Sequence, residues 1–149
     1  MLDAPDMKFH YDLTGIGWAD CTIEIGEATA TATASYLSDA LDDLAGAVVA
    51  LLRGDERSTA IFVEEPGEYS WEFTRKGSDG VRIRIRFLGA GSDDHPIFEA
   101  ETRLSTFAGA LLSELERLLR QYGTAGYKER WVRHAFPEHR VDQLKEFLA

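Results

Sequence analysis

This chain of 149 residues has a single cysteine, four prolines and no apolar run long enough to cross a bilayer. One thiol, Cys21, excludes an internal disulfide and fits a reducing, cytoplasmic compartment. The longest stretch of apolar and glycine residues, Leu44–Leu52, is much shorter than a membrane span. No basic segment precedes an apolar one near the first residue, so we expect no secretory signal. The length predicts one domain over residues 1–149.

The sequence also lacks the spacings that mark common catalytic and metal sites. No two of its four histidines are four residues apart, and no Cys-x-x-Cys motif occurs, so we predict no metal and no other cofactor. Phosphate-binding and nucleophile-elbow motifs are missing as well. The best polar cluster, Asp93-Asp94-His95, lies in a glycine-containing stretch that we interpret as a solvated loop. No catalytic residue is therefore predicted.

Positive charge is scarce in the first half of the chain. Residues 1–74 contain 15 acidic and 3 basic residues, whereas residues 75–149 contain 11 acidic and 13 basic ones. The net charge of −10 argues against non-specific binding of nucleic acid. The uneven distribution is typical of ordinary solvated surfaces, or of a two-signed surface that steers a protein partner.

Alternation of apolar and polar residues predicts the first strands. It covers Phe9–Leu13 and Ala19–Ile25, and it puts Cys21 on the apolar face. Gly26-Glu27 suits a two-residue turn with glycine first. The following run, Ala28–Ala34, alternates alanine with threonine, and its small inner side chains leave room for a bulky element. We expect a helix to dock on this alanine face.

A meander of further strands is predicted after residue 57. It comprises Ser58–Glu64, Tyr69–Phe73, Val81–Phe87 and Ile97–Thr102. The apolar residues on both sides of residues 77–80 are odd-numbered. The residue numbers of two paired residues on the antiparallel strands must therefore add up to an even number. A three-residue loop with a glycine bulge meets this condition, and a two-residue turn does not. The same register puts Glu72 opposite Arg84 or Arg86.

Leucine-rich stripes with a 3.6-residue period predict two main helices, at about residues 37–53 and 105–122. Ser38 is a suitable N-cap for the first, and glycines follow both helix ends. The first helix is apolar nearly all round near Val49, which indicates that it is either sandwiched between layers or buried in a homodimer interface. In the C-terminal tail, residues 126–134 are expected to form two helical turns with Tyr127 and Trp131 on one side. Phe136-Pro137 should break this helix, and a last short helix should follow.

We therefore predict an α+β domain, with a mostly antiparallel sheet of about six or seven strands packed with the two helices and a helical C-terminal tail. The two helices match at an offset of 67 residues, Leu37-Ser38 with Leu104-Ser105. This match suggests a βββα pseudo-repeat, and a chance likeness of two amphipathic helices is the alternative.

Several side chains are candidates for partner binding, each with a structural alternative. The arginine stripe, which comprises Arg82, Arg84 and Arg86, either contacts an acidic partner or pairs with Glu72 and with Glu99 or Glu101. The paired acids at the predicted turn near Pro66 suggest a carboxylate dyad for acid–base chemistry or a contact with a partner, and solvated turn carboxylates are the alternative that we prefer. The tail aromatics bind a partner or pin the tail to the core. The candidates are Arg82, Arg84, Arg86, Glu65, Glu68, Tyr127 and Trp131.

The chain resembles uncharacterised small bacterial proteins. The likeness rests on Glu64–Trp71 followed by Val81–Phe87, on Leu51–Gly54, and on Gly126–Trp131 with the Phe136-Pro137 break. It implies no activity. In size, acidity and strand–helix layout the chain is also similar to immunity proteins of polymorphic toxin systems.

Three functions follow from these patterns. The first hypothesis is a non-enzymatic protein-interaction module, immunity-like, that uses a charge-segregated surface. The alternative is a small enzyme or ligand-binding domain with a pocket between sheet and helices. The third is a homodimer through the apolar helix.

Overall fold

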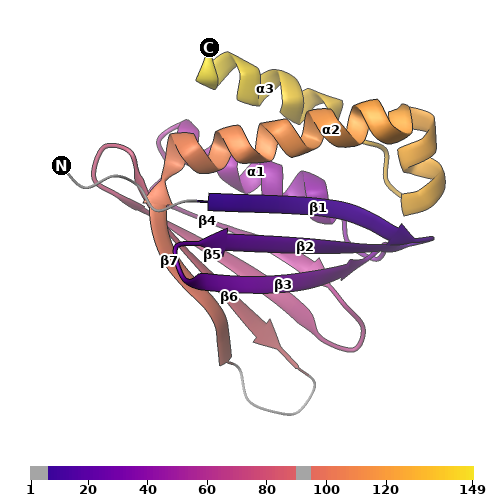
Figure 1. The fold of residues 1–149 in the computed structure, drawn as a ribbon, viewed down its shortest axis with the longest axis horizontal. Coiled ribbons are helices and arrows are strands. Elements are labelled where there is room, and N and C mark those ends of the chain that lie inside the picture. The colour runs from indigo at the N-terminus through magenta and orange to yellow at the C-terminus, as the bar shows by residue number, and fades with distance from the viewer. Residues whose placement is uncertain (1–6, 90–94) are drawn as a thin grey trace.

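The computed structural model describes residues 7–89 and 95–149, so the predicted loop acids Asp93 and Asp94 lie outside the described residues. Seven strands and three helices follow one another along the chain (Figure 1). The strands are β1 (Met7–Gly15), β2 (Trp18–Ile25), β3 (Ala28–Ser35), β4 (Arg57–Val63), β5 (Glu68–Lys76), β6 (Gly80–Leu88) and β7 (His95–Arg103). The helices are α1 (Ala40–Leu52), α2 (Leu104–Trp131) and α3 (Glu138–Leu148). The order confirms the predicted α+β class.

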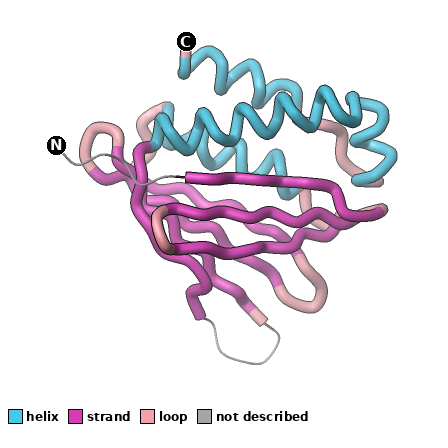
Figure 2. The backbone as a smooth tube through the Cα atoms, in the orientation of Figure 1, coloured by secondary structure: helices cyan, strands magenta, loops and turns pink. Residues whose placement is uncertain are grey.

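The strands form two antiparallel sheets instead of the single sheet that we expected. The first has the order β1-β2-β3 and the second the order β4-β5-β6-β7. The segment that leads into α1 lies on the outer edge of β4, where the Val63 N–H donates to Ser38 Oγ at 3.1 Å. The helices gather on one side of the two sheets (Figure 2).

Both predicted tight turns are confirmed by the strand registers. Ile25 pairs with Ala28, which leaves the two-residue turn Gly26-Glu27. Lys76 pairs with Gly80, which leaves a three-residue loop in which Gly77 has a φ of +68°. The even register also puts Glu72 opposite Arg84.

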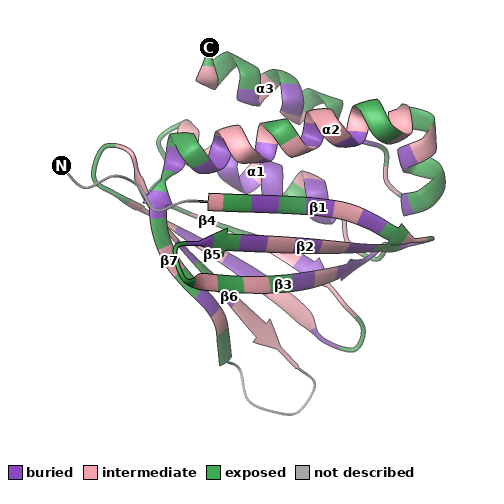
Figure 3. Ribbon diagram, in the orientation of Figure 1, coloured by how far each residue is buried: buried purple, intermediate pink, exposed green. Residues whose placement is uncertain are grey.

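The alanine face of β3 is covered by the second sheet and not by a helix, so that expectation was wrong. β3 contacts β4, β5 and β7. Large rings meet between the two sheets, where Phe62 on β4 lies 6.3 Å from Tyr11 on β1 and 5.2 Å from Trp71 on β5, centroid to centroid. Burial of such rings stabilises this core. Figure 3 shows buried residues alternating with more exposed ones along the strands.

Helix α1 begins at Ala40, later than predicted, because Ser38 bonds β4 and Asp39 takes the N-cap position. The helix lies among β4, β5, α2 and α3. Its apolar surface is therefore sandwiched within the chain, and Val49 is buried without a second copy.

Helix α2 ends its first part where the sequence predicted, because Gly123 has non-helical angles of φ 69° and ψ 172°. The chain then resumes a helix through Trp131, and α3 packs on both α1 and α2. The offset of 67 residues carries β3 onto residues 95–102 of β7. Three strands, β1–β3, precede α1, whereas four strands, β4–β7, precede α2. The strand numbers of the two units therefore differ, and the pseudo-repeat stays a prediction.

Candidate functional site

The arginine stripe lies on the outward face of β6 and is engaged in ion pairs. Arg82 and Arg84 bind Glu99 on β7, the second at 3.3 Å, and Arg86 binds Glu72 on β5 at 3.3 Å. The hydrogen bond from Arg82 holds the pKa of Glu99 below its ordinary value. Within the chain, the three arginines therefore form cross-strand ion pairs, which is one of the two interpretations given above for the stripe.

The candidate acids lie at the β4–β5 turn. Glu65 is exposed and Glu68 is half-buried. Burial, together with the interaction of its hydroxyl with the neighbouring Glu64 carboxylate, raises the pKa of Tyr69 to about 12. The turn is thus an anionic corner of the molecule.

The two candidate aromatics of the tail belong to the core. Tyr127 and Trp131 are fully buried, and the Tyr127 ring meets Phe136 edge-on with centroids 5.4 Å apart. Burial raises the pKa of Tyr127. Both side chains therefore pin the tail to the domain and have no surface to offer a partner.

A surface that we did not predict lies at the end of the molecule where the β1–β2 hairpin turns. Five large hydrophobic side chains are well exposed in the described residues, and four of them belong to segments that meet at this end: Ile16 at 73%, Trp18 at 37%, Leu37 at 41% and Val132 at 45%. Together with the half-buried Tyr36 they form what we call the end patch. Exposed apolar clusters of this kind are uncommon on monomers and mark binding surfaces.

Three segments are joined beneath the end patch by backbone hydrogen bonds. The Gly17 N–H donates to the Arg130 carbonyl at 2.7 Å, and the Tyr36 N–H donates to the Gly17 carbonyl at 2.9 Å. These bonds tie the β1–β2 turn to the end of α2 and to the segment after β3. Gly17 has a φ of +81°, and a Cβ there would come 2.8 Å from the Tyr36 ring, so only glycine fits this junction.

Val132 holds an unfavourable backbone conformation within the end patch. Its φ of 81° and ψ of −64° are rarely adopted by a β-branched residue. Strain of this kind costs about 1–3 kcal/mol and persists where the surroundings fix it. Here the chain turns sharply after α2, and the turn leaves the isopropyl group 45% exposed.

Cations surround the end patch although the whole chain is acidic. The Arg133 guanidinium lies 5.3 Å from the centroid of the Tyr36 ring, and that of Arg130 lies 5.1 Å from the centroid of Tyr122. Lys128 is exposed one turn before Val132. The exposed Glu129 lies among these cations, so the end patch is an apolar centre whose rim carries Lys128, Arg130 and Arg133 and one carboxylate beside them.

Two open hollows flank the end patch. One of about 650 Å³ is lined by Lys128, Val132 and their neighbours on the last turns of α2. The other, of about 370 Å³, is lined by Ile16, Tyr122 and Arg130. Both are surface depressions beside the end patch. A further open depression of about 420 Å³ lies away from it and is lined by residues of α1 and β4 and by Arg140 on α3.

Sequence reasoning missed the end patch because its side chains come from three separate segments. A signal was present for Trp18, which stands on the outward face of the alternation that continues through Ala19–Ile25. The spatial association with Val132 depends on how α2 docks, and strand periodicity carries no information on that.

Across residues 7–89 and 95–149, no group of three potential metal-binding side chains comes together. No helix in that part of the chain is long and apolar enough to span a membrane. No family model, curated protein or solved structure matches this chain.

Proposed function

We propose that the protein is a protein-interaction module that docks its partner on the end patch. The observation that carries this proposal is the gathering of four of the five exposed large hydrophobic side chains around one backbone junction. Tryptophan and arginine dominate the binding energy of many interfaces, and Trp18 lies in this surface with Arg130 and Arg133 at its rim.

The charged residues at the rim of the end patch indicate what kind of partner surface would fit. A surface with an apolar centre and acidic groups around it would satisfy Arg130, Arg133 and Lys128 while covering the end patch. In this proposal, the partner contacts the positively charged part of the charge-segregated surface. The arginine stripe does not take part and stays in its ion pairs with Glu72 and Glu99. A toxin domain is one such partner, as the likeness to immunity proteins implies.

The test is a quantitative pull-down from the native host with three forms of the chain. Trp18→Ser removes the central aromatic of the end patch. The matched control, Phe147→Ser, removes the exposed aromatic of α3, which is 42% exposed. We expect a stoichiometric partner that is recovered by the wild type and by Phe147→Ser and is lost with Trp18→Ser.

The affinity for the recovered partner should weaken by roughly tenfold or more in Trp18→Ser, the size expected of a hot-spot residue. Binding should also weaken as salt rises, because the rim acts through charge. Equal recovery by Trp18→Ser and the wild type would contradict docking on the end patch, and so would recovery that increases with salt.

A further inference from the structure

One of the four sheet edges is closed by a helix and another by the segment that leads into α1, each through specific hydrogen bonds. On the outer edge of β1, the Tyr11 N–H donates to Glu114 Oε2 at 2.9 Å, and Arg117 Nη2 donates to the Tyr11 carbonyl at 2.6 Å. On the outer edge of β4, Ser38 Oγ accepts from the Val63 N–H at 3.1 Å. The chain therefore covers these edges, which otherwise invite pairing with another strand.

The outer edge of β3 has no such cover in the described part of the chain. The two-residue turn makes Ile25–Ala28 a hydrogen-bonded pair, so the even-numbered residues of β3 bond to β2. The bond from the Tyr36 N–H to the Gly17 carbonyl continues the same series. The N–H and C=O groups of Thr29, Thr31 and Thr33 consequently point away from β2.

The sequence of β3 contains none of the features that usually block edge pairing. It has no charge and no proline over Ala28–Ser35, and its register with β2 runs without a bulge. Short neutral side chains let another backbone approach along its full length. An edge of this kind is a template for strand addition.

The facing sheet supplies a partly uncovered floor near this edge. Trp71 and Ile85 are fully buried, but two positions further along the same inner face Tyr69 and Phe87 are only half-buried. The Tyr69 and Phe87 rings lie 5.1 Å apart, centroid to centroid. The first sheet has one strand fewer than the second, and a strand added beside β3 would cover this pair of rings.

Acidic side chains lie near this edge at the end where β3 leads into α1. Glu64 follows β4 directly, and Glu65 and Glu68 lie at the same turn. Asp20, which is the register partner of Thr33, also acts on Tyr69 through its charge. A strand that lies here therefore meets negative charge at this end.

We propose that the free edge of β3 binds an extended basic segment of another protein by strand addition. The backbone of that segment pairs with Thr29, Thr31 and Thr33, alternate apolar side chains cover Tyr69 and Phe87, and a lysine or arginine faces the acids of the β4–β5 turn. The proposal concerns a surface other than the end patch and holds or fails independently of it.

The probe is a synthetic nine-residue peptide of alternating isoleucine and threonine that ends in two lysines, with a matched peptide that ends in two glutamates. Binding is followed by NMR as protection of the Thr29, Thr31 and Thr33 amides from hydrogen exchange. We expect the lysine peptide to slow exchange at all three by about tenfold or more, and the glutamate peptide to bind more weakly by a similar factor.

Thr31→Pro separates edge pairing from folding. Its N–H points away from β2, so proline removes an edge donor and keeps the β2 ladder intact. We expect this variant to melt within a few degrees of the wild type and to bind the lysine peptide at least about tenfold more weakly. Thr31→Val, which keeps the N–H, should bind like the wild type, and Trp18→Ser should as well.

Several results would overturn the proposal. They are unchanged exchange of the three threonine amides with the lysine peptide, equal binding by Thr31→Pro and Thr31→Val, and equal binding of the two peptides. A concentration-dependent dimer in sedimentation velocity that disappears in Thr31→Pro would assign the edge to a second copy of the chain and would equally overturn the proposed occupant.

Discussion

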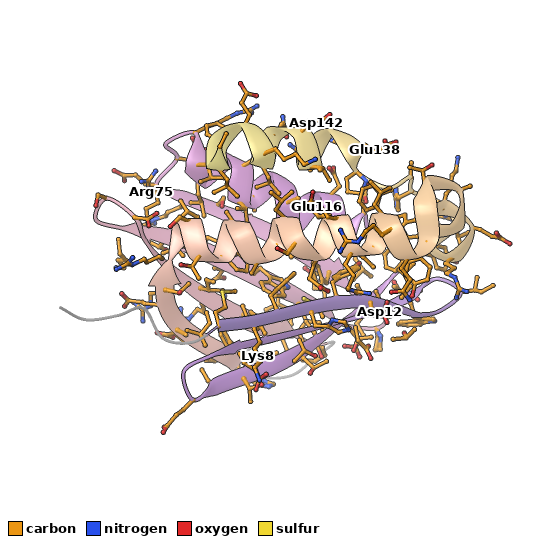
Figure 4. The ribbon with its side chains drawn as sticks, turned by 45° about the horizontal axis from the view of Figure 1, so that its top comes forward. Lys8, Asp12, Arg75, Glu116, Glu138 and Asp142 are labelled. Carbon is orange, nitrogen blue, oxygen red and sulfur yellow. The ribbon has the colours of Figure 1, made fainter. Side chains whose placement is uncertain are left out.

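Arg117 on α2 donates a hydrogen bond across 2.6 Å to the main-chain carbonyl of Tyr11 on β1, residues that are far apart in the sequence. Glu114 accepts from the N–H of the same tyrosine and also binds Arg117, at 3.0 Å. The Tyr122 hydroxyl adds a bond to Asp12 at 2.8 Å, and Figure 4 shows Asp12 beside the helix. This network fixes α2 on the edge of the first sheet, so the free edge of that sheet is β3.

Replacing Arg117 with alanine should destabilise the fold. The change removes the donor to the Tyr11 carbonyl and the arginine that binds Glu114, and we expect a loss of about 1–2 kcal/mol in the free energy of unfolding. Urea denaturation measures this loss. The matched control is Arg120→Ala on the exposed side of the same helix, which should change stability by less than about 0.5 kcal/mol.

Two glycines should respond to alanine with opposite signs. Gly17→Ala forces a side chain into a φ of +81° and against the Tyr36 ring, so we expect a loss of roughly 1–3 kcal/mol. Gly109→Ala lies within α2 with no atom within 4 Å of the new Cβ and should stabilise by about 0.5–1 kcal/mol. Thermal unfolding of both variants checks the pair, and the same sign for both would contradict the geometry of the Gly17 junction.

Local periodicity predicted the elements and much of the register. The odd parity of the apolar residues on both sides of the β5–β6 turn was enough to predict its three-residue loop and the pairing of Glu72 with Arg84. These features depend on residues close in the sequence. Because side chains alternate between the two faces of a strand, only one parity of the strand register keeps the apolar residues on the same face.

Longer-range features were beyond the sequence. Alternating alanine and threonine in β3 predicts a recess but cannot tell whether a helix or a second sheet fills it, since both offer large side chains. Ser38 reads as an N-cap, yet its hydroxyl accepts from Val63, because tertiary packing brings the edge of β4 closer than the first turn of α1. The end patch depends in the same way on the docking of α2 against the β1–β2 turn.

Cys21 should be unreactive in the folded protein. Its thiol is buried in the first sheet, and burial raises its pKa well above the ordinary value, so little thiolate forms at neutral pH. We expect reaction with a thiol reagent such as DTNB to be complete within minutes in urea and to take hours without it. Fast reaction of the native protein would mean that the inner face of β2 is open to solvent.

Asp39→Asn should stabilise the protein at neutral pH. Burial raises the pKa of the Asp39 carboxyl, and the charges of Asp42 and Asp43 raise it further while His134 opposes them. A raised pKa in the folded state means that the favourable contribution of this group is present at low pH and is lost as the pH rises through that pKa. At pH 7 the charged carboxylate therefore disfavours folding, and asparagine removes this cost while it remains a good N-cap residue.

The expected gain in Asp39→Asn is less than about 1 kcal/mol at pH 7, and it should shrink towards zero near pH 3, where both side chains are neutral. Urea denaturation at the two pH values measures it. Asp142→Asn on the exposed face of α3, labelled in Figure 4, is the control and should show a much smaller dependence. A gain that grows as the pH falls would contradict the sign of the shift.

Val132→Gly should separate stability from docking. Glycine adopts a φ of 81° without strain, so the variant should unfold with a free energy equal to or about 0.5–1 kcal/mol above that of the wild type. It also deletes an exposed apolar group from the end patch, so recovery of a partner that docks there should fall. Val132→Ala keeps the strain and loses most of the side chain, and it should weaken docking without the gain in stability. If Val132→Gly were less stable than Val132→Ala, the backbone at this position would not have the positive φ on which the shape of the end patch depends.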